Sequence, residues 1–184
     1  MGGYVFLSRL CYTPFIVAIH YKSIHRPIDL HSRGNVNVRA LVDTIDEGEL
    51  DLDPPYQRGH VWSLREQQDF IGYLLEGGET TAAYIRYLET SSEVVDGKQR
   101  ITAIYLWWKG QISARLSDGR EVWSKDMAAD ERRFVNMDLS LPVNYVVGTD
   151  MEIMKMYLRL NRGGKAHDPS ELARVENLIQ EGPV

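Results

Sequence analysis

The stretch VVDGKQRITAIYLWWKG, residues 94–110, carries the clearest structural signal in the chain. Two β-branched residues run into an Asp-Gly turn, and an apolar helical pattern follows. Four residues share one face of the expected helix: Ile101, Ile104, Tyr105 and Trp108. The helix begins with Lys98, Gln99 and Arg100, although the helix dipole favours negative charge at this end. A bound anion at the turn would explain this placement.

Further helix and strand signals lie on both sides of this stretch. Asn37 is the expected cap of a helix closed by Gly48, and Ser63 with Glu66 forms a capping-box pattern before a second helix. A hairpin is expected to turn at residues 117–119. The other expected elements are strands at 83–88, 93–95 and 139–147, a helix from Asp150 to Leu160, and a last helix opened by Asp168 and Pro169. This mixture predicts a compact α+β domain.

Residues 1–35 precede these signals and are interpreted as an N-terminal extension, with one or two strands, to a domain at residues 36–184. Polar residues and a proline interrupt its apolar run well before membrane-spanning length, so we expect neither a membrane span nor a secretory signal peptide. The single cysteine, Cys11, cannot form an internal disulfide, which favours a reducing cytoplasm.

The chain of 184 residues has a formal net charge of −5. This balance excludes a generally basic coat for nucleic acid, so any contact with DNA must come from a local patch. Three segments combine cations with glycine, proline or amide residues: PPYQRGHVW at 54–62, DGKQR at 96–100 and RLNRGGK at 159–165. We call them the first, middle and third segments.

The middle segment has the features of a phosphate site. Gly97 would let an anion approach the backbone, the first helical N–H groups would point at it, and Arg100 would add a forked pair of donors. Asp96 has two readings: it caps the helix, or it holds a magnesium ion that bridges phosphate oxygens.

The first and third segments each leave an alternative open. Arg58 could contact phosphate, and Gln57 could orient a water or read a base edge; alternatively, Tyr56 and Trp62 pack the loop while the polar residues face solvent. The cations of the third segment follow a helix, and the helix dipole alone would account for them.

Common catalytic and metal-binding patterns are missing from the sequence. GGKAH at 163–167 lacks the earlier glycine and the Ser/Thr of a P-loop, and no dinucleotide fingerprint occurs. The five histidines form no pair at helical spacing, so a zinc site is not expected. No Gly-x-Ser-x-Gly elbow is present.

Taken in order, DLDPPYQRGHVWS, VVDGKQRITAIYLW and YLRLNRGGKAHDPSEL resemble the motifs of the ParB/sulfiredoxin-like superfamily. The resemblance extends over residues 36–180 and is strongest to the branch found as the N-terminal domain of modification-dependent restriction enzymes and related phage-defence proteins. The hallmark of that branch is an Asp-Gly-Gln-Gln-Arg box. The resemblance implies a small mixed sheet with surrounding helices, a bound nucleoside triphosphate, often with magnesium, and hydrolysis coupled to action on DNA.

The resemblance also implies roles for individual residues. The catalytic candidates are Asp96, Arg100, Arg58 and Gln57, and Asp96 is the metal candidate. Of the nucleotide-binding candidates, the family motifs match Gly97, Gln99, Arg100, Asn161 and Gly164, and Lys98, Thr102 and Arg162 are further candidates beside them. Lys98 stands where the family usually has glutamine, and a lysine would contact triphosphate as a point charge.

The leading hypothesis is a phosphoryl-transfer enzyme that hydrolyses a nucleoside triphosphate, linked to DNA modification, restriction or phage-host conflict. One alternative is a kinase acting on a modified DNA base or a small molecule. A second is a non-catalytic DNA-binding or nucleotide-sensing module that works with a separate nuclease or modification subunit. A DNA endonuclease is the third, although the sequence contains no recognisable nuclease motif.

Overall fold

The computed structural model describes residues 29–59, 61–162 and 169–181. The strands are β1 (Asp29–Asn37), β2 (Leu50–Asp51), β3 (Ala83–Tyr87), β4 (Ser92–Asp96), β5 (Ala114–Arg115), β6 (Glu121–Val122) and β7 (Ser140–Val147). The α-helices are α1 (Val38–Asp46), α2 (Leu64–Leu75), α3 (Lys98–Trp108), α4 (Ala129–Asp138), α5 (Asp150–Arg162) and α6 (Pro169–Glu181). A 3₁₀ turn covers Ser124–Asp126.

The main sheet has five strands in the order β1-β7-β3-β4-β2. It is mixed: β1 pairs antiparallel with β7 and β3 with β4, whereas β3–β7 and β2–β4 are parallel pairs. Strands β5 and β6 form a separate hairpin. The architecture confirms the α+β fold class and the small mixed sheet expected from the sequence.

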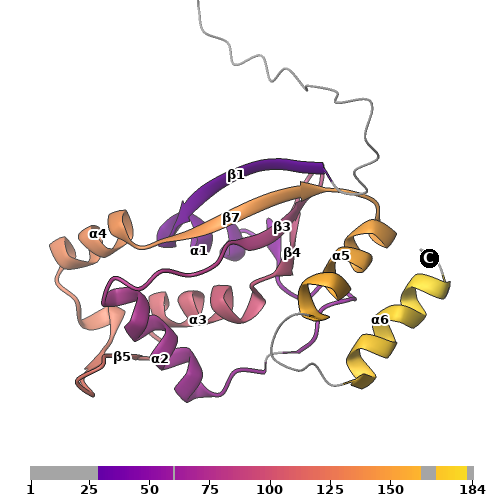
Figure 1. The fold of residues 1–184 in the computed structure, drawn as a ribbon. Coiled ribbons are helices and arrows are strands. Elements are labelled where there is room, and N and C mark those ends of the chain that lie inside the picture. Colours follow the sequence, from indigo (N-terminus) through magenta and orange to yellow (C-terminus); the bar gives the residue numbers. More distant parts are fainter. Residues whose placement is uncertain (1–28, 60, 163–168, 182–184) are drawn as a thin grey trace, which may run out of the picture.

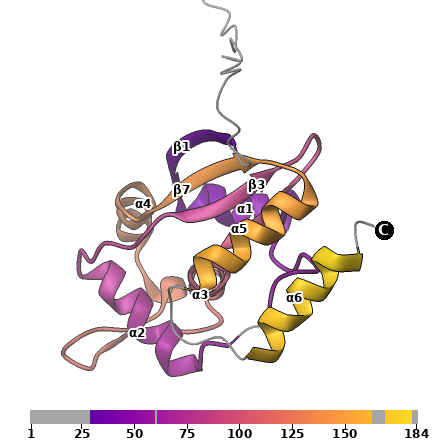
Figure 2. The same ribbon diagram turned by 45° about the vertical axis from the view of Figure 1, so that its right-hand side comes forward.

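Helices cover both faces of the main sheet. Val94 belongs to a core with α1, α2 and α3, whereas the next residue, Val95, belongs to a second core with α5 and α6. Consecutive residues of a strand point to opposite faces, so this division places α5 and α6 across the sheet from α3. Figures 1 and 2 show α5 and α6 beside one another at the same side of the fold.

Local capping signals fix the helix starts as predicted. The Asn37 side chain accepts a hydrogen bond from the Ala40 N–H at 2.8 Å and caps α1. Ser63 and Glu66 form the reciprocal capping box at the start of α2. Gly48 has a φ of 73°, a left-handed conformation that suits glycine just beyond a helix end.

Three elements differ from the sequence interpretation. Strand β1 crosses the proposed boundary at residue 36, because residues 29–35 already pair with β7. Helix α4 was not expected; it has no buried residue, so no apolar stripe marks it in the sequence. Thr149 takes the capping position expected of Asp150: its hydroxyl and N–H bond Glu152, and Asp150 instead pairs with Arg86 at 2.7 Å.

Two sequence predictions fall outside the described residues. They are the strands expected within residues 1–28 and the Asp168 cap of the last helix. Within the described ranges, no helix is both long and apolar enough to cross a membrane.

Candidate functional site

The three cationic segments meet at one pocket of about 160 Å³, although they are far apart in the sequence. The first segment contributes Gln57, Arg58 and Trp62, and the third contributes Asn161. The middle segment contributes all five of its residues, 96–100. The pocket therefore lies where β4 ends and α3 begins, between the loop before α2 and the end of α5.

Gly97 forms the turn between β4 and α3 and leaves no room for a side chain. Its φ is 98°, and a Cβ built on it would lie 2.8 Å from the Cβ of Ala83 in β3. Gly97 occupies the N-cap position, so α3 has no side-chain cap, and Asp96 does not cap it. The open start of an 11-residue helix is a favourable place for an anion.

Lys98 points into the protein rather than into solvent. Its ammonium group donates hydrogen bonds to the carboxylate of Asp53 and, at 2.8 Å, to the carbonyl of Arg58. The Lys98 side chain is 6% exposed, whereas that of Asp53 is 78% exposed. Lys98 therefore ties the first segment to α3, and its charge is already partnered.

Gln99 makes the same connection through neutral groups. Its Oε1 accepts hydrogen bonds from the Val61 and Trp62 N–H groups at 3.0 and 3.1 Å, and its Nε2 donates to the Gly59 carbonyl at 3.3 Å. Because Gln99 is buried, these contacts satisfy its amide and fix the loop that carries Arg58.

Arg100 is held by the segment before β3. Its guanidinium donates to the carbonyl and hydroxyl of Thr81 and pairs with Asp96 Oδ2 at 2.9 Å. Burial lowers the pKa of Arg100, and the Asp96 carboxylate opposes that effect. Arg100, which the sequence singled out for phosphate binding, thus has protein partners, and the Asp96 carboxylate offsets its positive charge in the pocket.

Arg58 is different from the other cations of the pocket. Among the residues that the structure describes, its guanidinium has no hydrogen-bond or ion-pair partner, although its carbonyl is bound by Lys98. Gln57, next to it, donates from Nε2 to the carbonyls of Val94 and Val95 at 2.9 and 2.8 Å. Gln57 therefore anchors the loop to β4, while Arg58 is available to a ligand.

The C-terminal wall of the pocket comes from α5. The Asn161 Nδ2 donates to the Tyr157 carbonyl at 2.8 Å, which orients the amide oxygen away from that carbonyl. Thr102 lies in α3 but is not among the lining residues. Arg162 is the last residue of α5, its side chain is not described, and Gly164 lies outside the described residues.

Sequence reasoning missed several residues of the site. Trp62 and Tyr157 line the pocket, although the sequence suggested only packing roles for tryptophan. Arg174 in α6 donates hydrogen bonds to the carbonyls of Pro55, Tyr56 and Gln57. No local signal identifies Arg174, because its partners lie 117–119 residues away.

A buried polar cluster of Tyr56, Arg86 and Glu93 links the first segment to the main sheet. The Tyr56 hydroxyl donates to Glu93 Oε1 at 2.9 Å, and Arg86 pairs with the same oxygen at 2.9 Å. The centroids of the Tyr56 and Tyr157 rings lie 5.6 Å apart. Burial, reinforced by the Glu93 charge, raises the pKa of Tyr56, so its phenol remains a hydrogen-bond donor.

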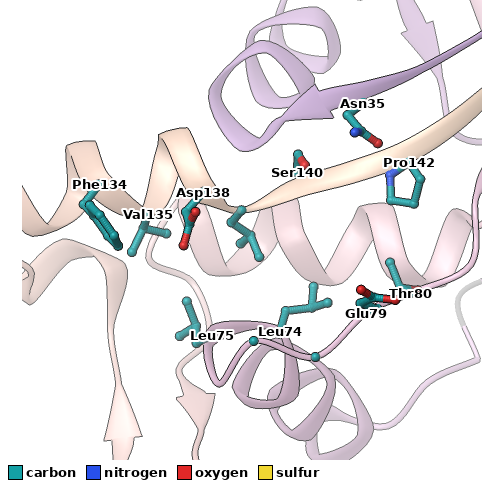
Figure 3. A pocket seen from close by; sticks show the side chains of 13 residues that line it. Asn35, Leu74, Leu75, Glu79, Thr80, Phe134, Val135, Asp138, Ser140 and Pro142 are labelled. Carbon is teal, nitrogen blue, oxygen red and sulfur yellow. The ribbon is translucent and has the colours of Figure 1, made fainter.

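A larger cavity, of about 610 Å³, lies elsewhere and holds no predicted site residue. Figure 3 shows Phe134, Val135 and Asp138 of α4 on one side and Leu74 and Leu75 of α2 below. Among the described residues, its ionisable lining groups are Glu79 and Asp138, and none is a cation. Two carboxylates without a cation disfavour a polyphosphate, so this cavity does not compete with the smaller pocket as a phosphate site.

Comparison with known proteins gives one family. The model of the family described as GmrSD restriction endonuclease, N-terminal domain, matches residues 38–141, more than half of the chain. No curated protein and no solved structure matches the chain. The matched residues include the first and middle segments, whereas α5 and α6 lie beyond them.

Proposed function

The chain belongs to the family of N-terminal domains of GmrSD restriction endonucleases, and from this premise we propose that it binds and hydrolyses a nucleoside triphosphate in support of restriction. The proposal assigns the nucleotide's phosphates to the pocket at the start of α3. Membership of the chain in the wider ParB/sulfiredoxin-like superfamily stays a prediction from the sequence motifs.

One observation carries the proposal: Arg58, whose guanidinium has no partner among the described residues, lines the same pocket as the open start of α3. Lys98 is paired with Asp53 and Arg100 with Asp96, so each of these cations is balanced by a carboxylate. Arg58 adds one positive charge that no described residue offsets. A pocket with an excess positive charge and free helical N–H groups suits an anionic oxygen cluster.

The size of the pocket limits what it encloses. A volume of about 160 Å³ is below the roughly 300–1,000 Å³ of typical small-molecule pockets, so the pocket would enclose the phosphate end of a nucleotide rather than the whole molecule. Trp62 and Tyr157 supply aromatic surface at the same pocket. The base would therefore lie toward the opening of the pocket.

Individual residues have distinct parts in the proposed reaction. Arg58 neutralises charge that develops on the transferred phosphoryl group, and the backbone at Gly97 approaches the phosphates. Gln57 and Asn161 position the polar groups that surround the phosphates. Lys98, Gln99 and Arg100 act mainly by holding the loop and the helix start in place, as their protein contacts indicate.

Asp96 fits a magnesium ion only together with the nucleotide. Asp96 uses Oδ2 for Arg100, which leaves Oδ1 for another contact. Across the described residues, no three His, Cys, Asp or Glu side chains form a metal-binding group. Mg²⁺ commonly uses one or two carboxylates plus phosphate oxygens, and when bound in this way it neutralises phosphate charge.

The proposal can be tested by a thermal-shift screen with ATP, GTP, CTP and UTP in the presence of magnesium. A nucleotide that binds only the folded protein raises its melting temperature. Arg58→Ala should abolish the shift without lowering the melting temperature of the free protein, because its guanidinium has no described protein contact. Arg39→Ala, which removes an exposed cation of α1, is the matched control. If no nucleotide stabilises the wild-type protein, the proposal fails.

The fate of a labelled γ-phosphate identifies the acceptor. Free phosphate is the outcome expected for hydrolysis. Label on DNA or on a small molecule would identify a kinase instead, and binding without turnover would identify a nucleotide-sensing module. Magnesium-dependent cutting of modified DNA by the chain, lost in Asp96→Ala, would favour the endonuclease alternative.

A further inference from the structure

Arg174 in helix α6 binds the backbone of the first segment. The Arg174 guanidinium donates from Nη1 to the carbonyl of Pro55 and from Nη2 to the carbonyls of Tyr56 and Gln57, the last at 2.9 Å. Three consecutive carbonyls thus converge on one guanidinium. The next residue along the chain is Arg58, a pocket cation whose guanidinium has no partner in the described part of the chain.

The first segment is consequently held from three directions. Gln57 ties it to β4, Lys98 and Gln99 tie it to α3, and Arg174 ties it to α6. The contacts to β4 and α3 lie within the stretch that the family model matches, whereas α6 lies beyond it. The loop geometry therefore depends on a helix from outside the matched region.

We infer that Arg174 is a positioning residue for the proposed phosphate site and that α6 is part of that site. The inference rests on the proposed function. The three hydrogen bonds of Arg174 go to backbone carbonyls that precede Arg58. Arg174 therefore acts by fixing these carbonyls and so the direction from which the Arg58 guanidinium enters the pocket. Without this contact the loop would sample several positions, and binding an anion would have to order it again.

Arginine is specifically suited to this role. Its planar, forked donors bond several acceptors at once, whereas a lysine ammonium is a compact point charge on a flexible stem. Lysine at position 174 would preserve the charge but not the three-carbonyl contact. This difference separates positioning from a general electrostatic effect.

Attachment of α6 to the domain has a separate basis. Val175, the neighbouring residue, is 1% exposed and packs in the core that also contains Tyr56. Val175→Ala weakens that packing and leaves the Arg174 contacts chemically intact. It is therefore the matched control for helix docking.

The test combines hydrogen exchange with binding of inorganic tripolyphosphate, in the full chain. Arg174→Gln and Arg174→Lys should both speed amide exchange in residues 53–62 by about tenfold relative to the rest of the domain, and should weaken tripolyphosphate binding by a similar factor. Val175→Ala should change exchange in this loop no more than in α6 itself. Circular dichroism confirms that each variant is folded.

The outcomes are distinguishable from failure of the proposed function. Unchanged amide exchange of the loop in both Arg174 variants would overturn the inference. It would also be overturned if Arg174→Lys speeds exchange of the loop but binds tripolyphosphate with the wild-type affinity. If wild-type protein does not bind tripolyphosphate or any nucleotide, the proposed function fails, and the exchange data alone then decide whether Arg174 orders the loop.

Discussion

Substitution of Gly97 by alanine should destabilise the protein for two reasons that can be measured separately. First, the φ of 98° is unfavourable for any residue with a Cβ, at a cost of about 1–2 kcal/mol. Second, the new Cβ would lie 2.8 Å from Ala83 Cβ and 3.3 Å from Ala83 Cα. Ala83 is fully buried in β3, so it cannot move aside easily, and such overpacking costs about 1–3 kcal/mol. The total expected loss is about 2–5 kcal/mol.

Gly119→Ala isolates the conformational part of this loss. Gly119 has a similar φ of 86°, but nothing lies within 4 Å of the position that its Cβ would occupy. It should therefore lose only about 1–2 kcal/mol. The effect of alanine on the unfolded chain is common to both positions and cancels in the comparison.

Urea unfolding at 25 °C gives the free energy of unfolding for both variants. We expect Gly97→Ala to be less stable than Gly119→Ala by about 1–3 kcal/mol. Losses that agree within about 0.5 kcal/mol would refute the reasoning, because the close approach of β3 to the turn would then have no energetic consequence.

Three further substitutions test the contacts that shape the site. Gln99→Leu leaves two loop N–H groups without their acceptor and should lower the free energy of unfolding, measured in urea, by about 2–4 kcal/mol. A loss below about 0.5 kcal/mol would show that water replaces the amide. Arg86→Met leaves the Glu93 carboxylate, which is 12% exposed, without its cation and should lower the free energy of unfolding by about 3–5 kcal/mol. Adding Glu93→Leu should recover most of that loss, because no unpaired charge is then buried. A double variant no more stable than Arg86→Met would contradict this expectation. Because the pKa of Tyr56 is raised in the folded protein, the stability that it contributes is complete below about pH 10 and declines above it, where the unfolded tyrosine ionises. Denaturant unfolding at pH 8–11 should therefore show a shallower decline in Tyr56→Phe, by up to about 1.4 kcal/mol per pH unit above pH 10, and identical slopes would count against a raised pKa.

Much of the fold follows from signals that operate over a few residues. Asn37 and the Ser63–Glu66 pair lie within one helical turn of the N–H groups they satisfy, so their pattern predicts the helix starts directly. Alternating apolar residues likewise predicted β7, in which Leu141 and Val143 are buried in one core. The alternation does not continue to the end of the strand, because Val146 is buried in the second core and Val147 is exposed. Helix α4 has no such periodic signal, and it was missed for that reason.

The three segments that form the candidate site were predictable from the sequence, but the roles of their individual residues were not. The sequence identified the segments that contain Arg58, Arg100 and Asn161, and these residues do share a pocket. It assigned phosphate binding first to Arg100, whose guanidinium is instead occupied by Asp96 and the residues before β3. The sequence shows both Arg100 and Asp96, but only the folded chain shows that they pair and that Thr81 accepts from the same guanidinium.

The sequence by itself determined the order of the elements, the Gly97 turn and the collection of cations and amides, because these depend on bonding within a few residues. Only the tertiary structure decided which of the described cations of the pocket pair with protein groups. Lys98 finds its acceptors 40 and 45 residues away and Arg174 more than 100 residues away, so their roles depend on how the sheet and the helices bring distant backbone carbonyls and carboxylates together. Because a buried cation is costly without partners, Lys98 takes these acceptors, whereas the Arg58 guanidinium has none among the described residues.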